Sequence, residues 1–213
     1  MLRYYLDLGT PAFEDYSPTL QAAKPHQLFS GPRILLRQLL SRKFRFQAIY
    51  TDAEFLTNQS VQSLVPRSVD IDPRALLGVL NSKILSWYFC QINLVARRDD
   101  FPKTIIKQTR ELPFPDIRTT SKSDRAQHDA LVTHVERMLK LHADLAAAKT
   151  PAAKTPAAQT HLQRDIAATD RAIDQLVYQL YGLTAEEIAL VEAATSPAVA
   201  ATDTPIDSEV TTP

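Results

Sequence analysis

Residues 170–187 read DRAIDQLVYQLYGLTAEE, and this stretch decides how the second half of the chain folds. Gly182 follows an amphipathic run and predicts the end of a long helix, because glycine accepts the left-handed conformation that often closes helices. Thr184 and Glu187 have the spacing of a capping box and predict a last short helix over 185–192. The stretch therefore predicts a helical scaffold, with nothing in it arranged for chemistry.

The apolar spacing upstream predicts that this long helix is one arm of a hairpin. Apolar positions step alternately by four and three residues in two runs, which is the signature of a coiled-coil seam. The tandem repeat KTPAAKTPAA at 149–158 must break the helix at its prolines, so the two arms are expected to fold back antiparallel. The predicted seam positions are Leu131, Val135, Met138, His142 and Leu145 in the first arm and Leu162, Ile166, Thr169, Ile173, Leu176 and Leu180 in the second.

The first half is predicted to form a small sheet covered by a helix. Three short runs, 32–39, 44–50 and 60–66, have strand character, and the second alternates apolar and polar residues. Asp72 and Pro73 open a helix whose apolar stripe continues to Cys90 and would lie on the sheet. A charged loop follows and leads into a short extended segment before 111–115, where two prolines end it.

These patterns predict an α+β fold: a small mixed α/β domain, then an antiparallel two-helix coiled-coil hairpin, then a disordered tail. Residues 1–30 are interrupted by three prolines and have the character of a linker. The mixed domain is placed at 31–118, and the hairpin with its short terminal helix at 125–192. Residues 193–213 have an Ala/Thr/Pro/Asp composition that cannot bury a core, which predicts disorder.

The formal net charge of zero conceals a division along the chain. Residues 1–120 hold 16 Lys and Arg against 11 Asp and Glu, and residues 121–213 hold 8 against 13, which together account for the 24 of each sign. A division of this kind suggests that the first half faces a polyanion while the second is scaffold or partner surface. Chance segregation of surface charge is the alternative.

Composition and motifs argue against most kinds of chemistry. The four glycines are too far apart for a phosphate-binding loop, and the histidines lack metal-ligand spacing. Cys90 is the single cysteine, which excludes an internal disulfide and fits a reducing compartment. Asp170 and Asp174 lie one helical turn apart, but solvated or salt-bridged acids explain them better than an acid/base pair. No catalytic, cofactor-binding or metal-ligating residue is therefore assigned.

Two further absences define the expected location. No run of 18 apolar residues exists, and the N-terminal residues lack the apolar core of a secretory signal. The chain is expected to be cytoplasmic, with no membrane partner.

The candidate binding residues are cations and amides in the first half. Lys and Arg supply affinity for phosphate, while Arg, Asn and Gln can read base edges. An ordinary solvated surface is the alternative at each position. The candidates for DNA binding are Arg37, Gln38, Arg42, Lys43, Asn58, Arg97, Arg98, Lys103 and Lys107.

Three stretches of the first half resemble a known family. RILLRQ at 33–38, LLGVLNSK at 76–83 followed by WYF at 87–89, and LPFP at 112–115 resemble the TaqI-like C-terminal specificity domain. That domain is the target-recognition part of adenine-specific DNA methyltransferases in restriction–modification and related phage-exclusion systems. The hairpin ending at 173–184 is similar to the tail that commonly follows it.

The resemblance implies a DNA target-recognition domain at 31–118 and double-stranded DNA as partner. It also implies S-adenosylmethionine as cofactor of the full-length enzyme, which methylates adenine at N6. The family's Asn-Pro-Pro-Tyr motif and Gly-rich cofactor loop are absent here, so this chain is expected to hold no cofactor. The simplest expectation is a C-terminal fragment served by a methyltransferase domain or subunit in trans. The alternative is a protein-interaction or assembly module that acts through the hairpin.

Overall fold

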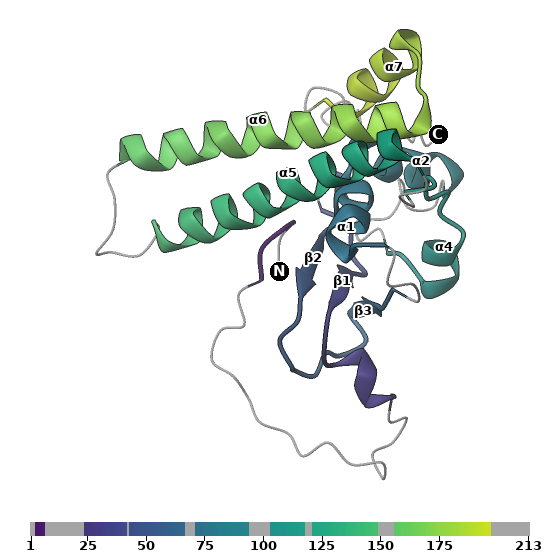
Figure 1. The fold of residues 1–213 in the computed structure, drawn as a ribbon. Helices are drawn as coiled ribbons and strands as arrows, with labels where there is room; N and C mark the ends of the chain where they lie inside the picture. Colours follow the sequence, from purple (N-terminus) through teal and green to yellow (C-terminus); the bar gives the residue numbers. More distant parts are fainter. Residues whose placement is uncertain are drawn as a thin grey trace, which may run out of the picture.

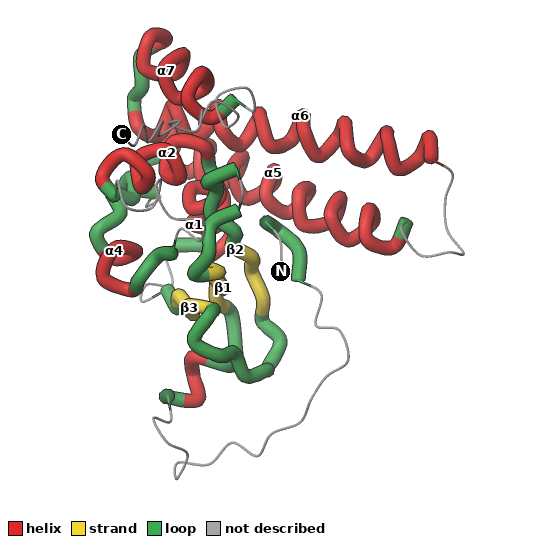
Figure 2. Tube along the Cα trace, turned by 180° about the vertical axis from the view of Figure 1, so that it is seen from behind, coloured by secondary structure: helices red, strands yellow, loops and turns green. Residues whose placement is uncertain are grey.

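The structure is a computed structural model in which a small sheet and a long helical hairpin meet at a common helical core (Figure 1). Seen from behind, the hairpin projects to one side of the molecule and the strands lie below its base (Figure 2). None of the described helices is long and apolar enough to cross a membrane. The described residues are 3–6, 24–41, 43–66, 71–93, 103–117, 121–148 and 156–196.

The sheet has three antiparallel strands in the order β2-β1-β3. The central strand is β1 (Arg33–Arg37), with β2 (Ala48–Thr51) and β3 (Val61–Leu64) on its two edges. A 3-10 helix, η1 (His26–Leu28), precedes it. The three predicted strands are confirmed, each shorter than the run that predicted it. Since β1 is paired on both sides and covered by α1, its middle residues are buried.

The predicted single helix after Asp72 is in fact two helices, α1 (Pro73–Asn81) and α2 (Lys83–Ile92). Asp72 caps α1 as predicted, because its side chain accepts a hydrogen bond from the Arg74 N–H. Ser82 is extended, its hydroxyl donates to the Val79 carbonyl at 2.6 Å, and the same oxygen caps α2. The apolar stripe therefore continues through Ser82, but the chain changes direction there.

The expected extended segment before residue 111 is also corrected, because most of it forms the short helix α4 (Ile106–Arg110). The side chain of Gln108 accepts a hydrogen bond from the Ile105 N–H at 3.1 Å and so satisfies one of the unpaired donors at the start of the helix. Lys103 still forms an isolated antiparallel bridge with Leu39. In the described part of this segment, backbone pairing with another extended stretch is thus limited to Lys103, before α4 begins.

The hairpin consists of α5 (Lys122–Ala147) and α6 (Pro156–Tyr181), which lie side by side in both views and run antiparallel (Figures 1 and 2). The helix α7 (Ala185–Thr195) follows. Gly182 has φ +65° and Thr184 with Glu187 forms the predicted capping box. The first residues of the predicted tail, 193–195, are thus helical, while 197–213 lie outside the described residues.

The buried face of the hairpin differs from the predicted seam at its base. Leu141 is buried rather than His142, and Val177 with Tyr178 is more deeply buried than Leu176. The reason is that α1 packs on both α5 and α6 and α2 packs on α6, so more than one line of residues is covered. The structure shows the helical hairpin, and the coiled-coil seam stays a prediction.

The sheet, α1 and the base of the hairpin share one hydrophobic core. Gly78 permits the closest approach, because a Cβ atom there would lie 2.8 Å from Leu131 Cδ1 and 3.0 Å from Val135 Cγ2. Tyr4 is also buried in this core, although the sequence predicts a linker-like segment there. Residues on both sides of 118–124 contribute to this one core. The domain boundary expected there from the sequence stays a prediction.

Candidate nucleic-acid interface

A groove of about 960 Å³ runs along β3, between η1 and α4. Figure 1 shows β3 at the sheet edge with these two short helices on either side of it. Its lining includes the apolar residues Ile34, Leu80 and Phe114 together with amide and cationic side chains. The polar and charged residues that line the groove are Lys24, Gln27, Gln38, Thr57, Gln59, Gln62, Ser63, Thr109 and Arg110.

Gln62 fixes α4 to the sheet beside this groove. Its side-chain nitrogen donates to the carbonyl of Thr104 at 3.2 Å and to the Thr104 hydroxyl at 3.1 Å. Its side-chain oxygen accepts a hydrogen bond from the Thr109 hydroxyl at 3.0 Å. All three side chains are buried, so these bonds form away from water and hold the wall of the groove in place.

Of the predicted DNA-binding residues, Gln38 lines the groove, and Asn58, Lys103 and Lys107 do not line it but lie on the segments that border it. The backbone of Gln38 pairs with both Ser60 and Thr104. Asn58 is exposed in the turn before β3, where its side-chain oxygen accepts from the Ser60 N–H at 3.0 Å. Lys103 and Lys107 are exposed at the start of the α4 segment and on α4 itself.

The other predicted residues do not join this group. Arg37 ends β1 and is half-buried, and it does not line the groove, unlike its neighbour Gln38. Lys43 is exposed in the turn at 41–45, whose Phe44 carbonyl contacts the Cys90 thiol of α2 at 3.9 Å, away from the groove. Arg42, Arg97 and Arg98 lie outside the described residues.

Several groove residues were missed by sequence reasoning. Lys24 and Gln27 belong to the stretch interpreted as linker-like, and Arg110 belongs to the stretch expected to be extended. Helical spacing could have found Arg110, because Lys107 lies three residues before it and so occupies a neighbouring helical face. No local signal marks Lys24 and Gln27, because the folding of η1 against β3 brings them there.

Other cations of the first half are not available to a partner. Arg33 is fully buried, and its guanidinium lies 5.0 Å from the centre of the Phe55 ring. Arg45 donates to the Asn81 carbonyl at 2.6 Å, and Arg3 donates to the same carbonyl at 3.1 Å. Part of the excess positive charge counted in the first half therefore lies inside the protein and not on its surface.

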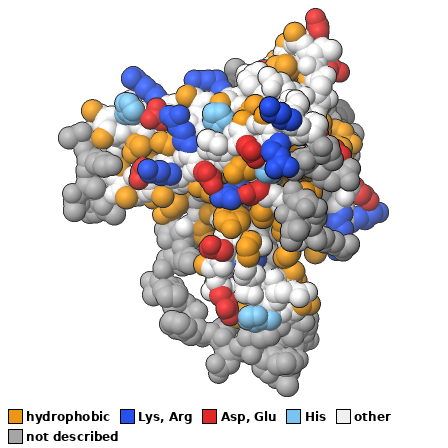
Figure 3. All heavy atoms as spheres, in the orientation of Figure 1, with side chains coloured by type: hydrophobic (Ala, Val, Ile, Leu, Met, Phe, Trp, Pro, Cys, Tyr) orange, Lys and Arg blue, Asp and Glu red, His pale blue; other side chains and the backbone are white. Residues whose placement is uncertain are grey.

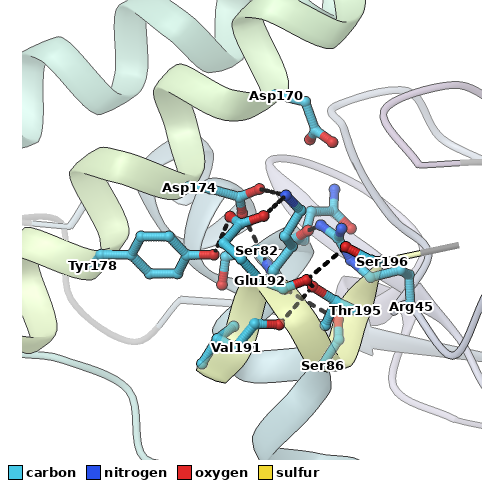
Figure 4. A network of polar contacts seen from close by, with 12 residues as sticks. Arg45, Ser82, Ser86, Asp170, Asp174, Tyr178, Val191, Glu192, Thr195 and Ser196 are labelled. Carbon is cyan, nitrogen blue, oxygen red and sulfur yellow. Dashed lines mark hydrogen bonds and ion pairs between the residues drawn. The ribbon is translucent and has the colours of Figure 1, made fainter. Parts of the chain in front are cut away.

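Arg3 and Arg45 belong to a buried polar junction between the sheet, α2 and the hairpin, of which Figure 4 shows Arg45 with Asp170 and Asp174. Arg3 forms an ion pair with Asp170 at 2.7 Å, and the backbone N–H of Lys83 donates to Asp174 at 2.8 Å. The Lys83 ammonium contacts Glu192 of α7 at 2.6 Å, and the Tyr178 hydroxyl donates to the other oxygen of that carboxylate at 2.8 Å. These contacts join the N-terminal segment and α2 to α6 and α7, which are far from both in the sequence.

The two aspartates of the junction have opposite pKa shifts. Burial raises the pKa of Asp174, which is only 1% exposed, more than the neighbouring charges of Arg45 and Lys83 lower it. Burial also acts against the ionised form of Asp170, but the charge and hydrogen bond of Arg3 outweigh it and leave the pKa of Asp170 below its usual value. The sequence predicts that these acids are either solvated or salt-bridged, and the structure shows that they are salt-bridged.

The surface drawn in Figure 3 carries most of its Lys and Arg side chains over the hairpin and at the edge where α4 lies. Acidic and histidine side chains occupy the sheet end of that face. On this face the cations are thus not confined to the first half of the chain. Among the described residues, no group of three or more His, Cys, Asp or Glu side chains could hold a metal ion.

Comparison with known proteins shows which family the groove-forming segment belongs to. Residues 2–114 match the TaqI-like C-terminal specificity domain. The chain belongs to this family. A protein of Methanocaldococcus jannaschii named "Putative type II restriction enzyme and methyltransferase" is 30% identical over 114 residues, which are 53% of this chain and 10% of that protein. The chain thus spans about a tenth of the length of this relative.

All residues that line the groove lie within this specificity domain match. The match also includes Arg3 and Tyr4, so the buried residues near the N-terminus belong to the family segment. The hairpin lies entirely beyond residue 114, and it meets the specificity domain through the shared core and the polar junction.

Proposed function

We propose that this chain is a DNA target-recognition module of a restriction–modification adenine-N6 DNA methyltransferase. One observation carries the proposal: a groove of about 960 Å³, lined by apolar, amide and cationic side chains, is built entirely by the segment that matches the TaqI-like C-terminal specificity domain. The match to a relative named as a restriction enzyme and methyltransferase supports the same role.

The side chains around the groove suit duplex DNA in two ways. Lys103, Lys107 and Arg110 are exposed, and cations of this kind bind phosphates and set the register of a protein on the duplex. Gln38 and Gln59 present amides, which can bond in a bidentate manner to N6 and N7 of adenine. The cations would supply affinity, and the amides would supply discrimination between bases.

In this proposal the methyl transfer takes place on another stretch of polypeptide, in the same protein or in trans. S-adenosylmethionine would bind there and supply the methyl group. The described residues of the present chain would select and orient the duplex for that domain. We assign them no catalytic or cofactor-binding role.

The hairpin is best interpreted as a buttress for the specificity domain. Its base shares the core with α1, and its buried acids pair with Arg3 and with the start of α2. Among the described residues of α5 and α6, no large hydrophobic side chain is exposed. An assembly surface on these two helices therefore has no apolar centre on which to dock a partner.

The proposal is tested by fluorescence anisotropy with a pool of labelled duplexes at several salt concentrations. Wild-type protein should bind, and its affinity should fall steeply as salt rises, because released counterions drive binding. The triple variant K103Q/K107Q/R110Q should bind more weakly and should lower the slope of log K against log salt by about 3 units, since each substitution leaves one phosphate without its cation.

The matched control is R137Q/K140Q/R164Q, which removes three exposed cations from the hairpin. This control should leave both the affinity and the slope at the wild-type values. Absence of binding by the wild-type protein at low salt, or an equal loss in the two triple variants, would refute the groove as the DNA interface.

A further inference from the structure

Two neighbouring isoleucines beside the groove are exposed although they are among the most apolar side chains of the chain. Ile105 is 53% exposed and Ile106 is 57% exposed. They occupy the N-cap and the first position of α4, which lies at the periphery of the molecule in both views of the backbone (Figures 1 and 2). Adjacent exposed residues of this kind are unusual for an isolated surface and suggest a contact with another molecule.

The pair is held on a fixed support. Gln108 accepts a hydrogen bond from the Ile105 N–H at 3.1 Å and donates to the Asn93 side chain at 2.7 Å, which ties α4 to the end of α2. The Thr109 hydroxyl lies within hydrogen-bond distance of the Gln62 side-chain oxygen of β3 at 3.0 Å and of the Ile105 carbonyl at 3.2 Å, and it can donate to either. A side chain presented from such a support loses little conformational freedom when it binds.

The surroundings of the pair are cationic. Lys103 precedes it, Lys107 follows it directly, and Arg110 lies one helical turn further along α4. Lys107 is 3.9 Å from Glu111, but both side chains are solvent-exposed, and such pairs are weak. Ile106 and Arg110 both line the groove, so the apolar pair borders the surface proposed to bind DNA.

We infer that Ile105 and Ile106 form an apolar wedge that enters a base step of the bound duplex, which rests on the proposed function. Proteins that bend DNA insert Ile, Leu, Phe, Met or Pro between base pairs and place cations against the phosphates on either side. A protein partner fits less well, because the centres of protein interfaces are poor in lysine and other charged residues. The occupant of this surface is therefore duplex DNA.

The wedge would give the module a second means of discrimination. Unstacking costs least at flexible steps such as TA and CA, so a duplex with such a step opposite α4 would be bent more readily than one without it. The preference would arise at a position where no hydrogen bond is made to a base. The amides of the groove and the wedge of α4 would thus read different properties of the same site.

The experiment uses the full chain and a duplex of about 30 bp selected by the wild-type protein from a randomised pool, with a dye at each end. Energy transfer between the dyes reports bending, and anisotropy reports affinity. The wild-type protein should bend the selected duplex by an angle within about 20–90°. In the variant I105S/I106S the bend should disappear, and the preference for the selected duplex over unselected DNA should fall about tenfold.

The matched control is Leu190→Ser on α7, where the side chain is 65% exposed and does not line the groove. This variant should bend and bind DNA like the wild type, and circular dichroism should show that both variants are folded. Unchanged bending by I105S/I106S would overturn the wedge while leaving the recognition role intact. Failure of the wild-type protein to bind any duplex would overturn the proposed function and the wedge with it.

Discussion

The buried junction and the groove use the cations of the same segment in opposite ways. At the junction, Arg3 and Arg45 point inward and bond the Asn81 carbonyl, and the carboxylate of Asp170 lies against Arg3. Beside the groove, Lys103 and Lys107 are exposed, and the bonds of Gln62 to Thr104 and Thr109 hold α4 against the sheet. Cations of the first kind stabilise the fold, and only the second kind is available to a polyanion.

The comparison separates stability from binding, because each region can be altered alone. Substitutions at the junction are expected to change the free energy of unfolding. Substitutions at the groove are expected to change DNA binding with little effect on that free energy.

The largest effect is expected for Asp174→Ala at the junction. The change leaves the Lys83 N–H without its buried acceptor and removes an acid that faces Arg45 and Lys83, so stability should fall by about 3 kcal/mol. Urea denaturation measures the loss. Asp165→Ala on the same helix removes only a partly exposed partner of His161 and should cost less than about 1 kcal/mol. Equal losses in the two variants would show that the junction is not the more stabilising region.

A smaller, pH-dependent effect is expected for Asp170→Asn. The Arg3 charge holds the folded-state pKa of Asp170 below its ordinary value of 3.8, so ionised Asp170 stabilises the fold above that value. At pH 7 the variant should be less stable than the wild type by about 2 kcal/mol. The difference should shrink as the pH falls from 3.8 through the lowered pKa, because the wild-type carboxyl is then protonated as well. Urea denaturation at several pH values across this range should show the unfolding free energies of the two proteins converging. A difference in free energy that stays constant with pH would contradict the ion pair.

An intermediate result is expected for Gln62→Leu, which lies beneath the groove. Loss of its bonds to Thr104 and Thr109 should cost about 1 kcal/mol and should loosen α4. Affinity for the selected duplex should therefore decrease more than affinity for unselected DNA, as measured by anisotropy. A variant with wild-type preference would show that the position of α4 does not matter for recognition.

The smallest effect on stability is expected for Lys107→Gln. Its exposed pair with Glu111 contributes little, so the free energy of unfolding should stay within about 0.5 kcal/mol of the wild type. The slope of log K against log salt should nevertheless fall by about one. Lys43→Gln is the control, because Lys43 is also exposed but lies away from the groove. A lower slope for Lys43→Gln alone would place the DNA on another face.

Features that depend on near neighbours could be predicted from the sequence. The cap at Asp72, the helix end at Gly182 and the capping box of Thr184 with Glu187 each involve residues within a few positions of one another. The strands and the hairpin follow from apolar spacing in the same way. Lys103 and Lys107 were predicted because charge alone marks them; the structure shows both exposed, and their DNA contact stays a prediction.

Features that depend on distant partners could not be predicted. Arg3 and Asp170 are 167 residues apart, so nothing near Arg3 indicates that it is a structural residue. The apolar stripe through Ser82 hides the change of direction between α1 and α2, because both helices bury the same stripe. Arg110 was missed since the segment holding it was expected to be extended, and an extended chain would place it differently from Lys107.

Lysine footprinting by acetylation and mass spectrometry, with and without the selected duplex, tests the central claim most directly. Lys103 and Lys107 beside the groove and Lys122 and Lys140 on α5 are all exposed in the free protein. Bound DNA should protect the first pair and leave the second pair as reactive as before. Protection of the α5 lysines alone, or of none of the four, would contradict recognition through the groove.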